Sequence, residues 1–279
     1  MTGHPLTWLY APGDRPHVVA KALTHGADAV VIDLEDAVAP DRKAYARAAT
    51  AEFLAEAPPV PVHVRVNAPG SAWGEEDVAA LGRAPGLSGL RLPKVTSPAE
   101  IVRVASRVTA GLHALVESAL AVERAYAIAT AHPGLRGISL GEADLRADLG
   151  VRDDRGLDWP RSRVVVAARA AGLPPPAQSV HPDIRDLPGL AASCAHGRAL
   201  GFLGRAAIHP RQLPVIERAY LPTEEEIERA ESVLKAAAAD PGAQALPDGR
   251  FIDAATVAAA RRTLSLTHRP GTHPGTRHG

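Results

Sequence analysis

The stretch AVVIDLEDAVAPDRKAYAR, residues 29–47, decides how the chain folds. Its opening residues, Ala29–Ile32, are apolar and mostly β-branched without alternation, which predicts a short strand buried on both faces. Three acids, Asp33, Glu35 and Asp36, follow at the end of that strand. Carboxylates packed together resist desolvation and repel one another, so we expect a basic side chain or a metal ion beside them. Capping of the following helix is the simpler alternative, because the positive N-terminus of a helix favours acids.

Similar apolar runs recur along the chain, with helical segments between them. Parallel strands need crossover helices, so this alternation predicts a parallel sheet. About eight such units predict an α/β fold of the (β/α)₈ TIM barrel type, with a doubly wound open sheet as the rival. No G-x-G-x-x-G loop follows a candidate strand, which disfavours the rival. The candidate strands are LTWLYA (6–11), AVVIDL (29–34), PVHVRV (61–66), LSGLRLP (87–93), LHALVE (112–117), LRGISLG (135–141), PAQSVHP (176–182) and GRAAIHP (204–210).

Residues 1–222 are therefore predicted to form the barrel, and a different pattern follows them. The segment PTEEEIERAESVLKAAAA, residues 222–239, predicts an amphipathic helix with acids in its first turn. A Pro/Gly-rich linker separates it from FIDAATVAAARRTLSL, residues 251–266, which predicts a second helix. We expect residues 223–266 to be a C-terminal helical extension and residues 267–279 to be a disordered tail.

Composition excludes several classes of function. The chain has 31 basic and 31 acidic side chains, which argues against a nucleic-acid or anionic-membrane binder. The N-terminus lacks a signal-peptide pattern and no apolar run approaches membrane-spanning length, so we expect a cytoplasmic protein. Cys194 is the only cysteine, so no internal disulfide can form, and we interpret it as an inert thiol in a helix.

Charged or polar side chains follow nearly every predicted strand, where the active sites of parallel barrels lie. They include no Ser-His-Asp or Cys-His order and no Cys/His cluster suited to zinc. Carboxylates and cations around one cavity favour Mg²⁺, which prefers oxygen ligands and keeps positions for water and substrate. In chain order the residues are Asp14, Arg15, Asp33, Glu35, Asp36, Arg65, Asn67, Lys94, Glu117, Asp144 and His209.

Each of these residues has a simpler interpretation when it is taken singly. Arg65 could be a surface cation, Lys94 could extend along apolar surface, and His209 before a proline could be structural. Glu117 and Asp144 could cap helices. A hydrophobic core, however, does not require a charge at every strand end, which favours a shared site.

The chain resembles the HpcH/HpaI aldolase and citrate lyase family, which includes citrate lyase β subunits and malyl-CoA and citramalyl-CoA lyases. The resemblance runs in colinear order from about Trp8 to Leu266. The motifs that carry it are APGDRP, GADAVVIDLEDAVAPDRKAYAR, VRVN, LPKV, VESA, GEADLRADLG, PRSR, AARAAGLP, VHPDIRD, ALGF and AIHPRQ.

The resemblance implies a (β/α)₈ barrel in which Glu117 and Asp144 hold Mg²⁺ and Arg65 contacts the substrate. Glu35 and Asp36 would hold Arg65, Lys94 and metal-bound waters in position, while Asp33 serves the barrel interior. The acids at the end of the first-quoted strand would thus lie beside the expected cations. Not all of these acids need to contact the metal.

The resemblance also implies contributions from outside the barrel. Asp253, in DGRFIDAAT, matches an acid that reaches into a neighbouring subunit, so we expect a homotrimer or hexamer. Phe251 and Ala255 depart from the family pattern DG-x-MID-x-P, and Asp253 as a helix N-cap is the alternative. Arg15 and Lys21 occupy positions where relatives meet coenzyme A phosphates, with ordinary exposed cations as the alternative.

The activity implied is Mg²⁺-dependent retro-Claisen cleavage of a β-hydroxyacyl thioester into an oxo acid and an acyl thioester. Arg65 would pair with a substrate carboxylate or developing oxyanion, and Asp253 would move the proton at the thioester α-carbon. Citryl, malyl and citramalyl thioesters remain open as substrates, as do coenzyme A and acyl-carrier protein as carriers. Two other functions also remain open: an aldolase acting on free oxo acids, and a subunit that binds an acyl thioester without cleaving it.

Overall fold

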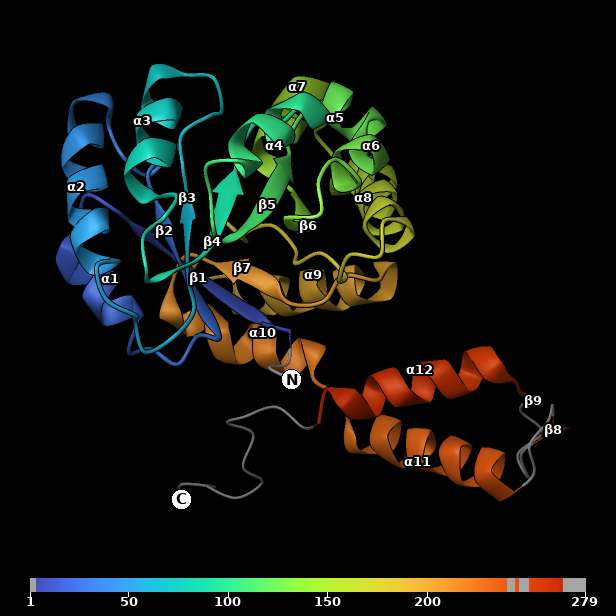
Figure 1. The fold of residues 1–279 in the computed structure, drawn as a ribbon. Helices are drawn as coiled ribbons and strands as arrows, with labels where there is room; N and C mark the ends of the chain where they lie inside the picture. Colours follow the sequence, from blue (N-terminus) through green and yellow to red (C-terminus); the bar gives the residue numbers. More distant parts are fainter. Residues whose placement is uncertain (1–3, 240–243, 246–250, 268–279) are drawn as a thin grey trace. The chain divides into compact units, whose positions relative to one another are not determined.

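The structure is a computed structural model that describes residues 4–239, 244–245 and 251–267. The described residues belong to two compact units (Figure 1). The larger unit is Pro5–Glu217, and the smaller one takes in His4 and the described residues from Arg218 onward. Among the residues described, no helix is both long and apolar enough to cross a membrane.

The larger unit is built on one parallel sheet that curls in the manner of a TIM barrel, with helices outside it (Figure 1). Its seven strands lie in the order β6-β5-β4-β3-β2-β1-β7, and every neighbouring pair is parallel. The predicted α/β barrel architecture is confirmed. The strands are β1 (Thr7–Pro12), β2 (Ala29–Asp33), β3 (Val62–Arg65), β4 (Leu87–Leu92), β5 (Gly111–Val116), β6 (Leu135–Leu140) and β7 (Arg205–Ala207).

The predicted strand at residues 176–182 is not a strand in the structure. Gln178 forms an isolated parallel bridge with Arg205, through its own N–H to Gly204 and its carbonyl to Ala206. Three consecutive prolines, at positions 174–176, precede it and have no N–H to donate to a ladder. The seventh barrel position is therefore an irregular segment, and β7 takes the place that the sequence assigned to an eighth strand.

The helices of the larger unit begin and end where local chemistry favours it. Ser97 and Glu100 form a capping box at the start of α4, and the Ser71 side chain accepts the N–H of Gly74 at the start of α3. Gly150, at φ +65°, takes the left-handed conformation that ends α7. The helices are α1 (Pro16–Ala22), η1 (Pro40–Arg42), α2 (Lys43–Phe53), α3 (Ala72–Leu81), α4 (Pro98–Ala105), α5 (Ala119–Glu123), α6 (Ala125–Ala129), α7 (Glu142–Leu149), η2 (Asp154–Leu157), α8 (Asp158–Ala170), α9 (Leu187–Leu200), η3 (Pro210–Gln212) and α10 (Leu213–Tyr220).

The interior of the barrel holds aromatic rings below the strand ends. The ring of His63 lies 4.9 Å from that of Trp8 and 4.7 Å from that of His113, in edge-on arrangements. Glycines on the neighbouring strands make room for these imidazoles. A Cβ atom at Gly89 would collide with the His63 ring, and one at Gly137 would lie 2.8 Å from His113 Nδ1.

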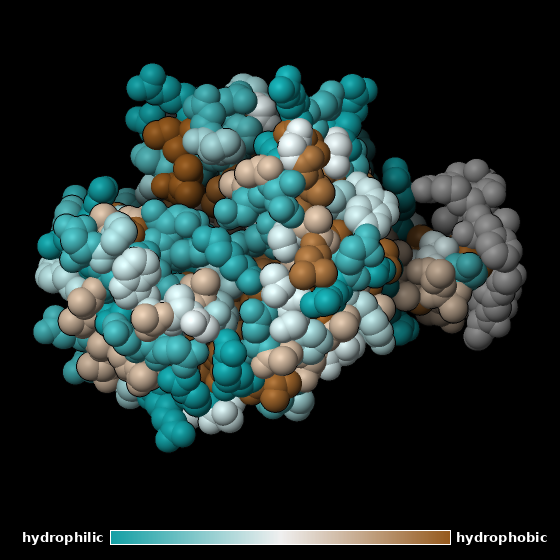
Figure 2. Space-filling model, turned by 90° about the horizontal axis from the view of Figure 1, so that it is seen from above, coloured by the Kyte–Doolittle hydropathy of each residue, from teal (hydrophilic) through white to brown (hydrophobic). Residues whose placement is uncertain are grey.

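The surface carries few large hydrophobic groups. The most exposed are Trp159 and Val166, each 59% exposed, both on α8. Figure 2 shows a face on which hydrophilic residues predominate and hydrophobic ones form small groups. Isolated exposed hydrophobic residues are normal for a soluble surface and indicate no particular site.

The smaller unit contains the two helices predicted for the C-terminal extension. Helices α11 (Glu224–Ala239) and α12 (Ala254–Ser265) pack side by side (Figure 1). Ala230 and Val233 of α11 meet Ala260 of α12 and Ile252 in a small apolar cluster. Two short strands, β8 (Gln244–Ala245) and β9 (Phe251–Ile252), pair antiparallel before α12. The tail predicted at residues 267–279 lies outside the described residues except for Thr267.

Candidate active site

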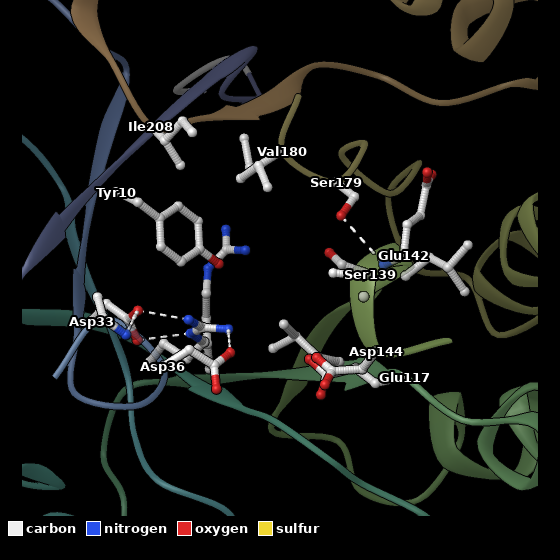
Figure 3. A pocket seen from close by; sticks show the side chains of 18 of the residues that line it. Tyr10, Asp33, Asp36, Glu117, Ser139, Glu142, Asp144, Ser179, Val180 and Ile208 are labelled. Atoms are coloured by element: carbon white, nitrogen blue, oxygen red, sulfur yellow. Dashed lines mark hydrogen bonds and ion pairs between the residues drawn. The ribbon is translucent and has the colours of Figure 1, made fainter. Parts of the chain in front are cut away.

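A cavity of about 450 Å³ lies at the carboxyl ends of the barrel strands (Figure 3). Residues from β1 to β7 and the loops that follow the strands line it. Parallel barrels place their catalytic groups at this end. The polar and charged side chains of its lining are Tyr10, Asp33, Asp36, Arg65, Arg91, Glu117, Ser139, Glu142, Asp144, Gln178 and Ser179.

Asp33 holds the guanidinium of Arg65 in a two-point contact. The two residues are register partners on β2 and β3, and Arg65 Nε and Nη2 donate to the two Asp33 oxygens at 2.7 and 2.6 Å. The same carboxylate accepts the N–H groups of Glu35 and Ala37. Burial alone would lower the pKa of Arg65, but hydrogen bonds and charge from Asp33 raise it above its ordinary value, so Arg65 stays charged.

Glu35 and Asp36 join Arg65 to Lys94. Arg65 Nη1 lies 3.1 Å from one carboxylate oxygen of each acid. Lys94 Nζ lies 2.9 Å from Glu35 Oε1 and 3.8 Å from Asp36 Oδ1. Burial raises the pKa of Glu35, although Arg65 and Lys94 oppose this shift. The opening acids thus meet two cations, and no side chain caps η1 or α2.

Glu117 and Asp144 lie next to each other on another side of the cavity (Figure 3). Glu117 follows β5 and is 4% exposed, and Asp144 lies in the first turn of α7. Burial raises the pKa of Glu117 to about 8, and the charges of Glu35 and Asp144 add to this effect. Gly141 leaves space for this side chain, because a Cβ atom there would collide with Glu117 Cγ.

This carboxylate pair fits a hard divalent cation. Burial and like charge both oppose ionisation of Glu117, and a bound cation would relieve both effects. Within the described ranges, no group of three or more His, Cys, Asp or Glu side chains is arranged to hold a metal. A cation here would therefore take its remaining oxygen ligands from water and substrate, as Mg²⁺ commonly does in proteins.

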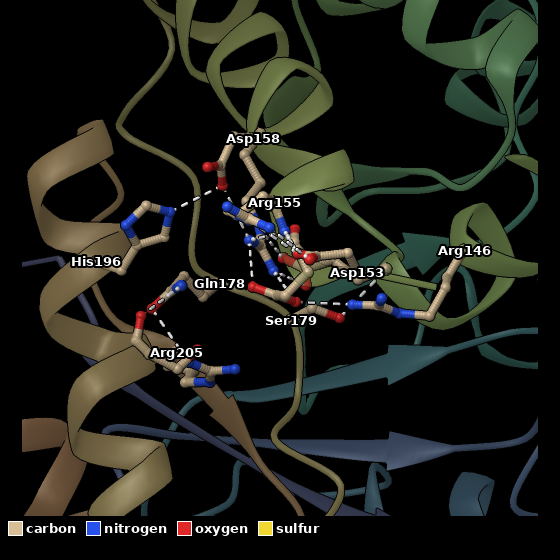
Figure 4. Close-up of polar contacts among 12 residues, drawn as sticks. Arg146, Asp153, Arg155, Asp158, Gln178, Ser179, His196 and Arg205 are labelled. Carbon is tan, nitrogen blue, oxygen red and sulfur yellow. Dashed lines mark hydrogen bonds and ion pairs between the residues drawn. The ribbon is translucent and has the colours of Figure 1, made fainter. Parts of the chain in front are cut away.

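A network of charged side chains fixes the start of α7, which carries Asp144. The carboxylate of Glu142, two residues earlier, accepts hydrogen bonds from Arg161 Nε and Nη2 at 3.0 and 2.6 Å. Arg161 is buried and also donates to Asp158, which lies 2.8 Å from His196 Nε2 (Figure 4). Hydrogen bonds to buried charged groups restrict side-chain motion, so this network positions the beginning of α7.

Other residues predicted for the site lie elsewhere. Arg15 and Lys21 are exposed at the two ends of α1 and do not line the cavity. Asn67 turns toward Asp77 and donates to its Oδ2 at 2.7 Å. His209 caps η3 by accepting the N–H of Arg211 and does not line the cavity.

Asp253 belongs to the smaller unit, where it caps α12. Its Oδ1 accepts the N–H of Thr256 at 2.7 Å and the Thr256 hydroxyl at 2.8 Å. These hydrogen bonds lower the pKa of the Asp253 carboxyl. Cys194, in the larger unit, is buried in α9, and burial raises the pKa of its thiol.

The sequence analysis does not single out Arg91 and Tyr10, which are among the residues that line the cavity. Arg91, on β4, is the register partner of Arg65, is 4% exposed, and lies 4.4 Å from the centre of the Trp8 ring. The centre of the Tyr10 ring lies 5.5 Å from Arg65 Cζ and 6.0 Å from Arg91 Cζ. The signal for Arg91 was a charge inside the apolar run LSGLRLP, directly before the end of the strand.

Comparisons with known proteins agree with the motifs. Residues 6–210 match the HpcH/HpaI aldolase/citrate lyase family. A (3S)-malyl-CoA thioesterase of Cereibacter sphaeroides is 36% identical over 273 residues, 94% of each chain. A citrate lyase subunit beta-like protein of Mycobacterium tuberculosis is 36% identical over 265 residues, 92% of this chain and 93% of that one.

A solved structure extends the agreement to the fold. The crystal structure of CitE from M. tuberculosis, in complex with magnesium, acetoacetate and coenzyme A, matches with a TM-score of 0.81 at 34% identity. The match covers 95% of this chain and 98% of that one. The chain therefore belongs to the HpcH/HpaI aldolase/citrate lyase family of enzymes, as its motifs predict.

Proposed function

We propose that this protein is a Mg²⁺-dependent carbon–carbon lyase that cleaves a β-hydroxyacyl-CoA thioester into an oxo acid and an acyl-CoA. The observation that carries the proposal is the placement of the Glu117–Asp144 pair and Arg65 around one cavity (Figure 3). The related CitE structure, which holds magnesium, acetoacetate and coenzyme A, supports both the metal and the carrier.

The metal would be held by Glu117 and Asp144. Mg²⁺ bound there would supply a Lewis acid that polarises the carboxylate and the neighbouring hydroxyl of the substrate. The Lys94 N–H donates to Glu117 Oε2 at 3.2 Å, which aims that carboxylate. The Arg161 network, through Glu142, fixes the turn that presents Asp144.

Arg65 would bind the substrate oxyanion or carboxylate. Asp33 fixes the plane of the guanidinium, while Nη1 contacts Asp36, whose side chain is 54% exposed. An anionic substrate group can replace an exposed carboxylate more readily than a buried one, because the exposed group is easily hydrated. Lys94 and Glu35 keep the local charge balanced while this exchange occurs.

The reaction moves one proton and one electron pair. The substrate hydroxyl loses its proton and becomes the carbonyl of the oxo acid, while the bond to the thioester α-carbon breaks. The electron pair passes to that carbon as an enolate, which then takes up a proton. We assign the transfer of this proton to the α-carbon to Asp253 of a neighbouring subunit in a homotrimer or hexamer. The family resemblance is the basis for this assignment.

Arg15 and Lys21 are the proposed contacts of the coenzyme A phosphates. Both side chains are exposed cations: Lys21 lies in the last turn of α1, and Arg15 directly precedes that helix. A flexible anionic carrier would meet them outside the cavity, because neither residue lines it. Substitution of both by Met should raise the KM for a CoA thioester several-fold at moderate ionic strength and leave Mg²⁺ binding unchanged.

Hydrolysis of the thioester is the second candidate function. It is favoured by a relative named (3S)-malyl-CoA thioesterase, which is 36% identical over 94% of this chain. The two activities differ in their products. A lyase releases an oxo acid and an intact acyl-CoA, whereas a thioesterase releases free coenzyme A and a hydroxy acid.

Product analysis tests the proposal. Purified protein with Mg²⁺ is incubated with citryl-, malyl- and citramalyl-CoA and with the corresponding free acids, and the products are separated by chromatography. Formation of acyl-CoA together with an oxo acid, abolished by EDTA, supports the lyase. Free coenzyme A without an oxo acid supports hydrolysis, cleavage of free acids alone supports an aldolase, and binding without turnover supports a non-catalytic subunit.

A further inference from the structure

We propose that Arg91 binds a second carboxylate on the oxo-acid half of the substrate, so that the protein selects thioesters that release a dicarboxylic oxo acid. This inference rests on the proposed function and names the substrate class of that site. It starts from the position of Arg91 inside the barrel.

Arg91 points into the same space as Arg65. The two residues are register partners on β3 and β4, and residues in register on parallel strands place their side chains on the same face. Arg91 lines the cavity, and only 4% of its surface is exposed to solvent. Its charge is therefore available to a molecule in the cavity and to little else.

Arg91 differs from the other deeply buried arginines in having no hydrogen-bonding partner among the residues that the structure describes. Arg161 donates to Glu142 and Asp154, and Arg205 donates to the Ser193 hydroxyl. Across the described part of the chain, no carboxylate forms an ion pair with Arg91, and its buried Nε has no acceptor. A buried guanidinium without an acceptor is costly, because desolvation is uncompensated.

The described side chains in contact with Arg91 are aromatic rings rather than carboxylates. Trp8 gives a cation–π contact at 4.4 Å, which is weaker than a hydrogen-bonded ion pair and leaves the N–H donors unused. His113, its register partner on β5, is neutral, since burial and the charge of Arg91 hold its pKa at about 3. Burial, followed by the charges of His113 and Arg91, also lowers the pKa of His63 well below its ordinary value.

The unmet donors of Arg91 define the chemical class of the ligand. A planar guanidinium pairs best with a carboxylate, through two parallel hydrogen bonds. The Glu117–Asp144 side of the same cavity would engage the 2-oxo acid group through its metal. A substrate fragment with a carboxylate beyond that group can bind the metal and Arg91 at the same time. A monocarboxylic oxo acid leaves Arg91 without an acceptor.

Calorimetric titration with oxaloacetate and pyruvate tests the inference, because these acids share the chelating group and differ by one carboxylate. In the presence of Mg²⁺, wild-type protein should bind freshly prepared oxaloacetate at least tenfold more tightly than pyruvate. Arg91→Met should reduce this preference to less than twofold and leave pyruvate affinity within twofold of wild type. Arg83→Met, which removes an exposed arginine outside the cavity, should keep the full preference.

The outcomes separate this inference from the proposed function. Equal affinity of wild-type protein for the two acids would overturn the role of Arg91 even if the substituted protein does not fold. An equal loss of affinity for oxaloacetate and pyruvate in Arg91→Met would overturn it as well, because removing a purely structural arginine would weaken the binding of both acids. A preference that depends on Arg91, in a protein that fails to cleave thioesters, would support the carboxylate site and reject the lyase.

Discussion

The backbone N–H of Lys94 donates to Glu117 Oε2 at 3.2 Å, while its side-chain Nζ lies 2.9 Å from Glu35 Oε1. Lys94 adopts a positive φ of 54°, which is unfavourable for a residue with a side chain. The turn after β4 thus joins the carboxylate pair to the acids that follow β2. One strained residue connects the two halves of the candidate site.

Glu117→Gln should abolish Mg²⁺ binding without unfolding the protein. The amide keeps the shape of the side chain but removes the charge that a cation requires, so affinity should fall at least about 100-fold. The metal-free protein should be equally stable or more stable by about 1 kcal/mol, because a buried carboxyl beside other acids is lost. Calorimetry measures the affinity, and urea denaturation measures the stability.

The matched control for this substitution is Glu52→Gln, on an exposed position of α2. It removes the same charge and should leave Mg²⁺ affinity within twofold of wild type. Unchanged Mg²⁺ affinity in Glu117→Gln would remove Glu117 from the metal site.

Arg65→Lys should reduce turnover about as much as Arg65→Ala. Lysine keeps the charge but cannot reproduce the two-point contact with Asp33, so the cation is no longer held at a fixed position. Asp33→Asn should also lower turnover, by about tenfold or more, because the amide accepts fewer hydrogen bonds from the guanidinium. Steady-state kinetics with the identified thioester measures each change.

Arg42→Lys serves as the control, since Arg42 is half-exposed and its pairing with Asp14 is loose, at 3.9 Å. It should show wild-type kinetics. Full activity of Arg65→Lys would show that charge alone suffices and that the planar geometry of the guanidinium is not needed.

The sequence predicts β2 well, as AVVIDL at 29–34 against Ala29–Asp33 in the structure, because an unbroken β-branched run has one favourable environment. It assigns Arg65 to Glu35 and Asp36 and places Asp33 in the barrel interior, whereas in the structure Asp33 makes the two-point contact with Arg65. That difference depends on the register of β2 against β3, which a single chain segment does not encode. Arg91 was overlooked for the same reason, since its inward direction follows from its pairing with Arg65.

The contribution of neutral His113 to stability should be lost as pH decreases below about 6.5. Burial, together with the charges of Arg91 and Arg136, lowers the pKa of His113 in the folded state to about 3, from an ordinary value of 6.5. The unfolded chain takes up the proton first, so the stabilisation present above pH 6.5 is lost as pH falls toward 3. Each such histidine contributes a slope of at most about 1.4 kcal/mol per pH unit.

Urea denaturation at pH 7, 6 and 5 measures this slope. His113→Gln removes this contribution, because the amide does not titrate in this range, so the stability of wild type relative to the variant should decrease from pH 7 to pH 5. His17→Gln, at an exposed position on α1, should leave the slope as in wild type. An identical slope in His113→Gln and wild type would contradict the assignment of the acid sensitivity to this side chain.

Asp253→Asn should separate capping from catalysis. Asp253 accepts the N–H of Thr256 at the start of α12, and asparagine caps helices about as well as aspartate. The Asn variant should therefore keep its stability but lose most turnover if the carboxylate moves the substrate proton. Asp253→Ala should lose turnover and also about 1 kcal/mol of stability, because the cap is removed. Full activity of Asp253→Asn would leave capping as the role of this residue.

Subunit mixing tests whether Asp253 acts in a neighbouring active site. Inactive Asp253→Asn protein is combined with inactive Glu117→Gln protein under conditions that allow exchange, which native mass spectrometry verifies. A shared site can then pair an intact Glu117 from one chain with an intact Asp253 from another. With equal amounts and random assembly, each partner is suitable about half of the time, so about a quarter of the sites should regain activity. If exchange is complete and the mixture remains inactive, Asp253 does not complete a neighbouring site, and the proton at the α-carbon must be moved by a group within the barrel.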